Sequence, residues 1–404
     1  MSASGAGVAP RAIGTAPLTV GIVAGESSGD QLGASLIEAL RALVPDVRCC
    51  GVAGPKMLAA GCEAWASADE LAVMGLTEPI RHLPRLARLR WRLRRRFAQL
   101  RPGVFVGIDA PEFNLGLARK LRRAGIRTVQ YVSPQVWAWR QGRVRTIAQA
   151  CDLVLCLLPF ETAFYAHHGI AAVFVGHPLA DQIPLDVDRR GAREALGIAA
   201  DATLVALLPG SRLGEIERLG ADFVAAAAWI AARRPQIRFV APMASAQARA
   251  AFERHLGGPG TPDVMLLQGQ AQRALAAADA AIVVSGTATL ETLLTGRPMV
   301  VAYRTSRITA FVLRTLRLVK VPYFSQPNLL VGHRLVPEFL QEAVNGAALG
   351  GALLQELEDG AHVAQLKREF RAVHEMLRLG GARRAALAVI ECATTSQSHE
   401  RDRA

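Results

Sequence analysis

The chain offers little from which a disulfide framework, a metal centre or a membrane span could be built. Its 404 residues include only six cysteines, and these fall at neither CxxC nor any other metal-ligand spacing. In a chain of this length we expect them to stay reduced and buried. The first strongly apolar run, Leu18 to Ala24, is too short for a signal-peptide core or a transmembrane helix. These absences favour a cytoplasmic protein.

Aromatic residues and acidic charge are also scarce. Aromatic residues make up 5% of the chain, and 34 acidic residues face 47 lysines and arginines, which leaves a formal charge of +13. No recognised nucleic-acid-binding module occurs, and few aromatic side chains are present to stack on bases, so we expect no nucleic-acid ligand. The positive charge still calls for an acidic partner, such as an anionic lipid surface or a phosphorylated substrate.

What the chain does have is an alternation of short apolar runs with helix-like stretches. The runs are continuous, as expected for strands of a parallel sheet that is buried on both faces. They lie at 18–24, 104–108, 128–132, 153–157 and 173–175, and again at 203–208, 237–241, 264–267, 281–284 and 299–302. We therefore predict an α/β protein with two Rossmann-like, doubly wound domains.

The domain boundaries follow from changes in composition. A polar, proline-containing passage after Gly176-His-Pro178 separates the two series of strands, and both chain ends are rich in small or polar residues without apolar periodicity. We expect a disordered tail over 1–17, a first domain over 18–185, a second over 186–345, helices over 346–392 and a disordered tail over 393–404. Ligands of such sheets bind at the carboxyl ends of the strands, so we expect the site in the cleft between the domains.

The loop after the first strand is Gly25-Glu-Ser-Ser-Gly29, which matches neither GxxxxGK[ST] nor GxGxxG. One interpretation is a tight strand-to-helix turn. The other is a surface on which Glu26, Ser27 and Ser28 exchange hydrogen bonds with the hydroxyl groups of a sugar.

Asp109 follows the strand at 104–108 and precedes Pro111. A carboxylate that is partly desolvated at a strand end would have a raised pKa and would suit a general base. A helix-capping aspartate is the alternative. We predict Asp109 as the general base.

The loop Tyr131-Val-Ser-Pro-Gln-Val-Trp-Ala-Trp-Arg140 follows the next strand. Trp137 and Trp139 either fill gaps in the core or stack on sugar rings. His177 either caps a strand or contacts ligand. Asp186-Val-Asp188 matches a paired-aspartate metal pattern, but it lies in the predicted linker, so we expect no metal there.

Two loops in the second half suit a nucleotide diphosphate. Pro209-Gly-Ser-Arg212 is a short glycine turn whose backbone N–H groups and arginine suit a diphosphate. In Ser285-Gly-Thr-Ala-Thr-Leu-Glu291, Ser285 and Thr287 begin a helix whose positive end attracts phosphate. Glu291 lies one turn further on, within reach of ribose hydroxyls.

The stretch from Arg81 to Arg101 is strongly basic and has one apolar stripe at helical spacing, formed by Leu86, Leu89, Leu93, Phe97 and Leu100. A solvated surface helix is one interpretation. The other is a membrane-surface helix, because Trp91 stands among arginines on the far side. In that case Trp91, Arg92 and Arg95 would contact anionic headgroups, and Met74 and Leu76 in the preceding apolar segment would insert shallowly or line an acyl-chain groove.

Taken together, these motifs resemble the lipid-A-disaccharide synthase family of membrane-associated bacterial glycosyltransferases. Between Leu18 and about Cys392 the family's motifs occur in order: AGESSGD, VAGPKM, ELAVMGL, GIDAPEFN, YVSPQVWAWR, LPFE, GHPLAD, LLPGSR, SGTATLE, PMVVAYR and YFSQPNLL. The resemblance implies a GT-B fold with the nucleotide in the second domain and the acceptor in the first. It implies that UDP-2,3-diacylglucosamine donates its sugar to 2,3-diacylglucosamine 1-phosphate without a metal or other cofactor, which yields a β-1,6-linked disaccharide and UDP.

The resemblance also implies roles for single residues. By motif, Asp109 corresponds to the base and Glu26 to a second active-site acid, while Asn328 corresponds to an active-site asparagine. The residues that correspond to nucleotide contacts are Ser211, Arg212, Thr287 and Glu291. The family further suggests peripheral attachment to the inner membrane and a homodimer that exchanges C-terminal segments.

Two departures and two rival functions stand beside this resemblance. Ser27 replaces a frequent threonine, and the 81–101 stretch carries extra arginines. The rival with the same fold is a UDP-sugar epimerase or a transferase of non-acylated sugars. The rival from another class is a non-catalytic membrane-binding protein.

Overall fold

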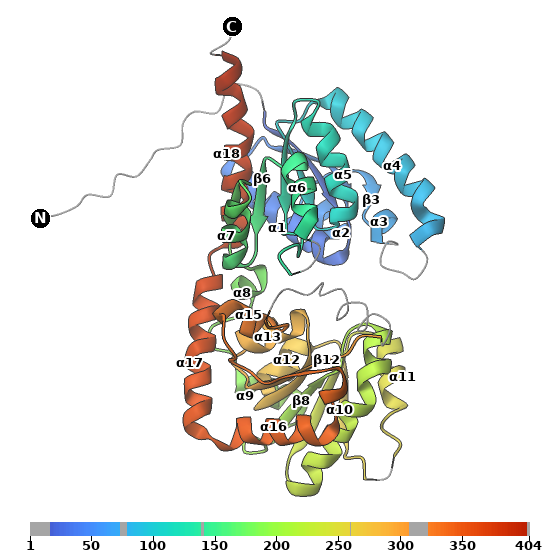
Figure 1. Cartoon of the computed structure of the whole chain (residues 1–404), viewed down its shortest axis with the longest axis vertical. Coiled ribbons are helices and arrows are strands. Elements are labelled where there is room, and N and C mark those ends of the chain that lie inside the picture. The colour runs from blue at the N-terminus through green and yellow to red at the C-terminus, as the bar shows by residue number, and fades with distance from the viewer. Residues whose placement is uncertain (1–16, 73–78, 139–140, 259, 307–321, 402–404) are drawn as a thin grey trace, which may run out of the picture.

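The computed structural model describes residues 17–72, 79–138, 141–258, 260–306 and 322–401, without the side chains at 72, 79–83 and 396–401. Two parallel sheets follow one another along the chain, and helices cover both (Figure 1). This arrangement confirms the predicted α/β class and the two doubly wound domains. In the described part of the chain, no helix combines the length and apolar character needed to cross a bilayer.

The first sheet contains seven parallel strands in the order β3-β2-β1-β4-β5-β6-β7. Every residue of β4 is buried, and so are all residues of β1 after Thr19, which accounts for their continuous apolar sequences. The strands are β1 (Thr19–Ala24), β2 (Arg48–Ala53), β3 (Glu63–Ser67), β4 (Val104–Ile108), β5 (Arg127–Tyr131), β6 (Leu153–Cys156) and β7 (Ala172–Phe174). The helices are α1 (Ser27–Leu43), α2 (Pro55–Ala59), α3 (Asp69–Ala72), α4 (Pro79–Leu100), α5 (Pro111–Arg122), α6 (Val144–Ala150) and α7 (Pro159–His167).

The second sheet contains six parallel strands in the order β10-β9-β8-β11-β12-β13, so its centre repeats the topology of the first. The strands are β8 (Leu204–Leu208), β9 (Arg238–Met243), β10 (Val264–Gln268), β11 (Ala280–Val284), β12 (Met299–Tyr303) and β13 (Glu338–Leu340). The helices are α9 (Arg189–Leu196), α10 (Leu213–Arg233), α11 (Ala246–Glu253), α12 (Ala271–Ala277), α13 (Thr287–Leu294), α15 (Gln326–Val331) and α16 (Gly346–Glu358).

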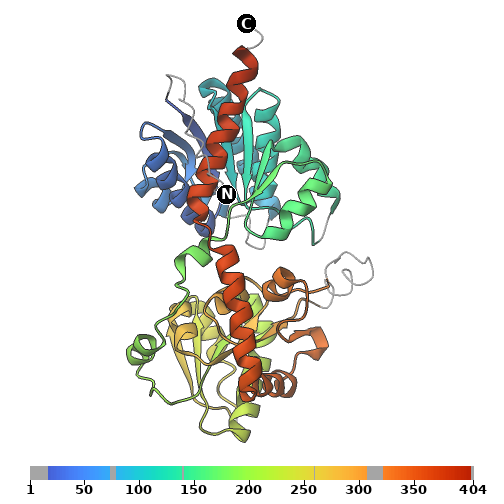
Figure 2. The same ribbon diagram turned by 90° about the vertical axis from the view of Figure 1, so that its left-hand side faces the viewer.

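The chain passes between the domains twice. The first passage runs through α8 (Pro178–Gln182), and the second lies between α17 (Gly360–Leu377) and α18 (Gly381–Arg401). The Asp181 carboxylate accepts hydrogen bonds from Gly380 N at 2.9 Å and Gly381 N at 2.7 Å, which ties the two passages together. Figure 2 shows the two helices in red, end to end with a break between them, α17 on the second domain and α18 on the first.

The C-terminal helices differ from the sequence-based expectation. They do not form one unit, because α17 packs on the second domain and α18 returns to α1, β4 and β5 of the first. The expected tail from 393 onward is also different, since α18 continues to Arg401. Ala385, Ala386, Val389 and Ala393 are buried in the core of the first domain. That packing nucleates the helix, and adding further turns then costs little.

The elements that follow the carboxyl ends of the strands lie at the boundary between the domains. After β7 the chain enters α8, which contacts α13, the helix that follows β11. Figure 1 places α8, α13 and α15 between the two sheets. The fold therefore turns both carboxyl edges toward the interdomain region, where doubly wound proteins bind ligands.

Candidate active site

Two loops touch at the carboxyl edge of the first sheet. Gly25 follows β1 and Ala110 follows β4, and a Cβ atom added at Gly25 would lie 2.7 Å from the Cβ atom of Ala110. Only glycine allows so close an approach of the two loops. The structure thereby brings Glu26 next to the loop that carries Asp109, as the predicted site requires.

Backbone strain gathers at this edge. Asp109 has φ 51°, Ala110 φ 41° and Val132 φ 73°, a left-handed region that is unfavourable for non-glycine residues and most of all for a β-branched one. The Asp109 carbonyl is held by hydrogen bonds from Asn114 Nδ2 at 2.9 Å and Gln130 Nε2 at 3.1 Å. Each strained residue costs on the order of 1–3 kcal/mol, and such strain clusters at functional sites.

Asp109 has the properties of a proton acceptor. Burial raises the pKa of its carboxyl, and the charge of Glu112 raises it further, while a hydrogen bond from the Ala110 backbone opposes both effects. A carboxylate with a raised pKa takes a proton more readily. The capping interpretation is wrong, because α5 has Ala110 as its N-cap and no side chain caps it.

Glu26, Ser27 and Ser28 are exposed at the start of α1. Glu26 is the N-cap residue, yet its side chain makes no capping hydrogen bond, so the carboxylate is available to a ligand. The last residue of the motif has a different task. Asp30 is buried and accepts hydrogen bonds from Gly54 N, Lys56 N and Met57 N at 2.9 to 3.0 Å, which ties α1 to the start of α2. Sequence analysis missed this role, because the motif does not distinguish a buried aspartate from a ligand-binding one.

The tryptophan loop after β5 is fastened to a buried carboxyl. Trp137 Nε1 donates to Glu161 Oε1 at 3.0 Å, and its ring packs edge-on against Phe160 at 4.8 Å between centroids. Burial raises the pKa of Glu161 to about 7, against hydrogen bonds from Leu158 N and Trp137. Trp137 therefore holds the loop in place, which favours the structural of the two interpretations. Trp139 lies outside the described residues.

The loop after β11 exposes hydrogen-bond donors. Thr287 is exposed as the first residue of α13, and the first-turn N–H groups of a helix have no partner within the helix. Ser285 Oγ donates to Phe324 O at 2.7 Å and so holds the chain that leads into α15. Burial raises the pKa of Glu291, and within the described residues its carboxylate has no hydrogen-bond partner. This loop keeps the chemistry predicted for a nucleotide site.

The loop after β8 differs from expectation. The Glu215 carboxylate accepts hydrogen bonds from Ser211 N at 3.1 Å and Arg212 N at 3.3 Å, so these N–H groups are occupied. The cause is a capping box, in which a glutamate at the third helical position reaches back to the N-cap. The Arg212 guanidinium pairs with Glu215 through Nη1 at 3.4 Å, but its side chain is 83% exposed, so its remaining N–H groups are accessible to a phosphate.

Asn328 is fully buried, and its amide is used within the protein. Its Oδ1 accepts from Leu335 N at 2.8 Å and Val336 N at 2.9 Å, while Nδ2 donates to Val336 O and Glu338 Oε1. No hydrogen-bonding group of the side chain is left for a ligand. Asn328 therefore differs from its expected role, since it acts on the site by holding α15 against the segment before β13.

The remaining candidates are used in the fold. His177 Nδ1 accepts from Leu179 N at 3.2 Å and caps α8, and burial lowers the pKa of His177 to about 4. Asp188 caps α9 through Gly191 N at 2.8 Å, and Asp186 pairs with Arg371 at 2.9 Å. In the described part of the chain, no three His, Cys, Asp or Glu side chains are grouped so that they could hold a metal ion.

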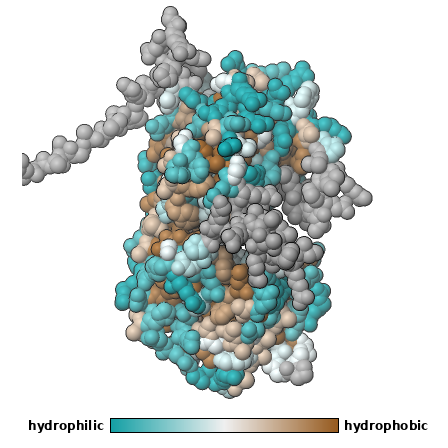
Figure 3. Space-filling model, in the orientation of Figure 1, coloured by the Kyte–Doolittle hydropathy of each residue, from teal (hydrophilic) through white to brown (hydrophobic). Residues whose placement is uncertain are grey.

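The basic helix α4 has the predicted two-sided character. Leu86, Leu89, Leu93 and Phe97 are buried, whereas Trp91 is 58% exposed. The Arg95 guanidinium lies 5.8 Å from the centroid of the Trp91 ring, and Arg92 lies 3.8 Å from Glu70. Figure 3 shows hydrophilic side chains over much of the domain that carries α4. Met74 and Leu76 lie outside the described residues.

Comparison with known proteins connects these features. A family model described as lipid-A-disaccharide synthetase matches residues 20–391. The chain is 50% identical over 379 residues to the lipid-A-disaccharide synthase of Serratia proteamaculans, covering 93% of this chain and 98% of the relative. It is 51% identical over 374 residues to that of Pseudomonas aeruginosa strain UCBPP-PA14, with the same coverages.

Solved structures show the same fold at much lower identity. The calicheamicin glycosyltransferase CalG4 superposes with a TM-score of 0.57 at 16% identity, covering 93% of this chain and 98% of that one. The UDP-GlcNAc 2-epimerase from Neisseria meningitidis superposes with a TM-score of 0.58 at 12% identity, covering 94% and 100%. These neighbours show the fold alone, which transferases and epimerases share.

Proposed function

The chain belongs to the lipid-A-disaccharide synthase family, and from this premise we propose that it transfers the sugar of UDP-2,3-diacylglucosamine to 2,3-diacylglucosamine 1-phosphate. The products are lipid A disaccharide 1-phosphate and UDP, in lipid A biosynthesis. The observation that carries this proposal is 50% identity to named synthases over 93% of the chain. The carboxyl edges of the two sheets support the proposal, because the first presents carboxylates and the second presents groups suited to phosphate.

The residues divide the reaction between the domains. The acceptor hydroxyl attacks the anomeric carbon of the donor while Asp109 takes the hydroxyl proton, which forms the new glycosidic bond and breaks the bond to UDP. A single displacement of this kind inverts the anomeric configuration. Glu26, beside the Asp109 loop, orients acceptor hydroxyls by accepting their hydrogen bonds.

The second domain stabilises the leaving group. Negative charge develops on the departing diphosphate, and the exposed Arg212 guanidinium and the start of α13 supply positive charge and N–H donors. Thr287 adds a hydroxyl at the same helix start, and Glu291 accepts from the ribose hydroxyls. The Ser211 backbone N–H is occupied by Glu215, so any contribution from Ser211 comes through its side chain.

Access to acylated substrates calls for a membrane surface. We propose that α4 attaches the protein to the cytoplasmic face of the inner membrane, with Arg92 and Arg95 at anionic headgroups and the exposed Trp91 at the boundary. Met74 and Leu76, and a homodimer that exchanges C-terminal segments, stay predictions. Light scattering of the purified protein tests the dimer.

The deciding experiment measures UDP release in mixed micelles with each lipid substrate alone and with both together. We expect release only when both are present, with a disaccharide product visible by mass spectrometry. Activity on soluble UDP-sugars without detergent would favour the rival of the same fold. Liposome binding without UDP binding would favour a non-catalytic membrane protein.

A further inference from the structure

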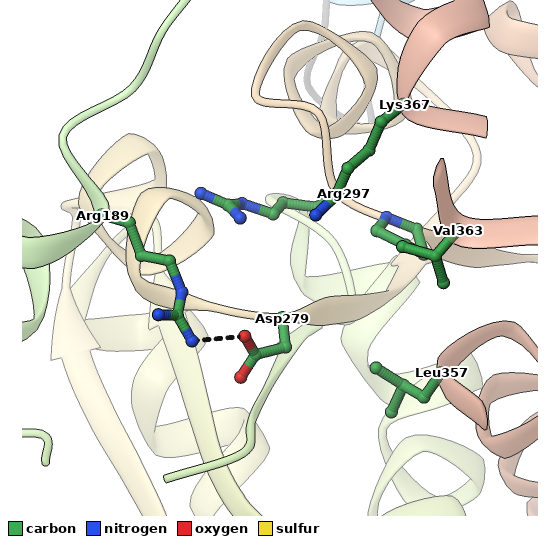
Figure 4. A pocket seen from close by; sticks show the side chains of 7 residues that line it. Arg189, Asp279, Arg297, Leu357, Val363 and Lys367 are labelled. Atoms are coloured by element: carbon green, nitrogen blue, oxygen red, sulfur yellow. Dashed lines mark hydrogen bonds and ion pairs between the residues drawn. The ribbon is translucent and has the colours of Figure 1, made fainter. Parts of the chain in front are cut away.

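A cavity of about 380 Å³ in the second domain is lined by Arg189, Asp279, Arg297 and Lys367, together with apolar side chains (Figure 4). Among its lining residues, Asp279 directly precedes β11 and Pro298 directly precedes β12, so the cavity is at the amino ends of these strands. Strands of five residues, at about 3.3 Å per residue, place it about 16 Å from the carboxyl edge. The cavity is therefore separate from the predicted nucleotide site.

The charges around this cavity do not balance. Arg189, Arg297 and Lys367 line it together with one carboxylate, Asp279. That carboxylate is already committed, because it accepts from Arg189 Nη2 at 2.7 Å and from the buried Arg193 Nη2 at 2.7 Å. Among the residues that the structure describes, Asp279 is also the only acidic group whose charge raises the pKa of Arg297 or of Lys367. Four cations thus share one anion among the described residues.

Three of these cations have donors to spare. Arg297 is only 7% exposed, and its Nε and Nη2 donate to the carbonyls of Leu275 and Ala276 at the end of α12. Its Nη1 has no partner in the described part of the chain, and neither has Lys367 Nζ. Within the same described residues, Arg189 donates only through Nη2, to Asp279. Arg193 contributes charge alone, since its three nitrogens are bonded to carbonyls and Asp279.

We infer that this cavity is a second anion site, which binds a small molecule bearing a phosphate or diphosphate group between Arg189, Arg297 and Lys367. A phosphate group fits better than a single carboxylate, because it carries more negative charge and more acceptor oxygens for the spare donors. The volume is within the range of small-molecule sites. An adjoining cavity of about 440 Å³ shares the same three cations, which leaves room for the rest of such a ligand.

The site lies on elements next to both connections between the domains. Arg189 is the first residue of α9, just after the first passage, and Lys367 lies on α17, which leads to the second passage. An anion that bridges the two side chains would link both connections. The site goes beyond the proposed transferase activity and can be tested without it.

The test is isothermal titration with pyrophosphate at constant ionic strength, in an Arg212→Ala background that weakens the predicted nucleotide site. Lys367→Glu reverses an exposed charge at the cavity without removing a packed side chain. The matched control, Arg254→Glu, makes the same charge change at an exposed residue after α11, which does not line the cavity. We expect Lys367→Glu to weaken pyrophosphate binding by about tenfold or more, as for loss of a charge-assisted hydrogen bond, and Arg254→Glu to leave it unchanged.

Other outcomes would overturn the inference. Absence of pyrophosphate binding would do so, as would binding that both charge reversals weaken equally, because that result indicates a general charge effect. Pyrophosphate binding by the chain with Arg212 intact would place the anion at the carboxyl edge if Arg212→Ala abolished it and Lys367→Glu alone left it unchanged. Citrate that binds more tightly than pyrophosphate would assign the cavity to carboxylates instead of phosphates. Since the titration does not involve glycosyl transfer, its failure is distinguishable from failure of the transferase proposal.

Discussion

The carboxyl edges of the two sheets have the same central topology and opposite chemistry. Strand order β2-β1-β4-β5 in the first sheet corresponds to β9-β8-β11-β12 in the second. The first edge presents carboxyl groups, with Asp109 and Glu161 partly or wholly desolvated. The second presents the long, exposed side chain of Arg212 and the start of α13. The comparison teaches that the topology decides where a ligand binds, whereas the loop residues decide which ligand it is.

The two edges also differ in their cost to the fold. The first edge holds three strained residues, Asp109, Ala110 and Val132, and a buried carboxyl group. At the second edge the loops after β8 and β11 place their positive φ angles on glycines, Gly210 and Gly286, where they cost little, whereas Gln270 after β10 (φ 59°) and Gln341 after β13 (φ 54°) are left-handed without being glycine. The difference between the edges therefore lies in single loops: left-handed non-glycine residues stand in the loop where we place proton transfer, and glycines take the positive φ angles in the two loops where we place the diphosphate.

The largest expected effect breaks the first edge. Asp109→Asn removes the proton acceptor, and asparagine tolerates the left-handed backbone at this position. We expect kcat to fall about a thousandfold, within the range for loss of a general base. The measurement is steady-state UDP release with both lipid substrates.

Stability serves as the control for this variant. Burial raises the pKa of Asp109, so the folded state holds the proton more tightly than the unfolded state. The resulting stabilisation is present at low pH and is lost as pH rises through the folded-state pKa, which leaves the ionised form unfavourable at pH 7. Asp109→Asn should therefore keep or raise the Tm at pH 7. Turnover near the wild-type rate would refute the assignment of Asp109 as base.

The second effect tests how much burying Glu161 lowers the free energy of unfolding when its carboxyl is ionised. Its pKa is about 7 in the folded protein against an ordinary value of 4.5, so its stabilising contribution is complete below pH 4.5 and is lost as pH rises through 7. We expect the free energy of unfolding to fall by on the order of 3 kcal/mol over this range through Glu161. Glu161→Gln should flatten that part of the dependence, as measured by urea-unfolding midpoints between pH 4.5 and 8.

Glu194→Gln is the matched control, because Glu194 is exposed on α9 and, among the described residues, pairs only with the exposed Arg190. It should leave the wild-type pH dependence in place. If Glu161→Gln shows the same slope as the wild type, the buried carboxyl does not titrate in this range.

The third effect sharpens the division of labour. Arg212→Ala removes the exposed guanidinium from the second edge, and we expect UDP to bind about thirtyfold more weakly, the size of one charge-assisted hydrogen bond. Asp109→Asn should leave UDP affinity unchanged. Isothermal titration with UDP measures both, and equal losses in the two variants would show that the edges do not divide the substrate as proposed.

The smallest effect concerns the proposed membrane-binding surface on α4 of the first domain. In our proposal the second domain has no such surface. Arg95→Gln removes one positive charge beside Trp91 and should weaken binding to anionic vesicles about fivefold. Arg254→Gln removes one charge from the second domain and should have no effect. Sedimentation with vesicles of anionic and neutral lipids distinguishes the two, and equal losses would mean that only net charge matters.

Sequence reasoning reached the strands and the positions of the candidate residues because its signals are local. The strands were predictable from continuous apolar runs, and the places of Asp109, Thr287 and Glu291 beyond strand ends followed from the same runs. Roles that depend on distant partners were not predictable. Asp30 bonds to residues at least 24 positions away, and Asn328 is engaged by the chain at 335–338. A sequence motif contains such structural residues together with candidate ligand-binding residues, and the motif alone does not distinguish the two kinds.

By itself, the sequence determined the fold class, the two domains, the family and the strand ends at which chemistry is expected, because apolar periodicity and contiguous motifs are properties of neighbouring residues. The tertiary structure alone decided which motif residues are buried or bonded within the protein and which are exposed at the carboxyl edges, because burial and hydrogen bonding depend on segments that meet only in the folded chain. In the folded chain, Glu215 accepts hydrogen bonds from the N–H groups of Ser211 and Arg212, and α18 packs on the first domain. Arg189, Arg297 and Lys367, which are far apart in the sequence, line one cavity.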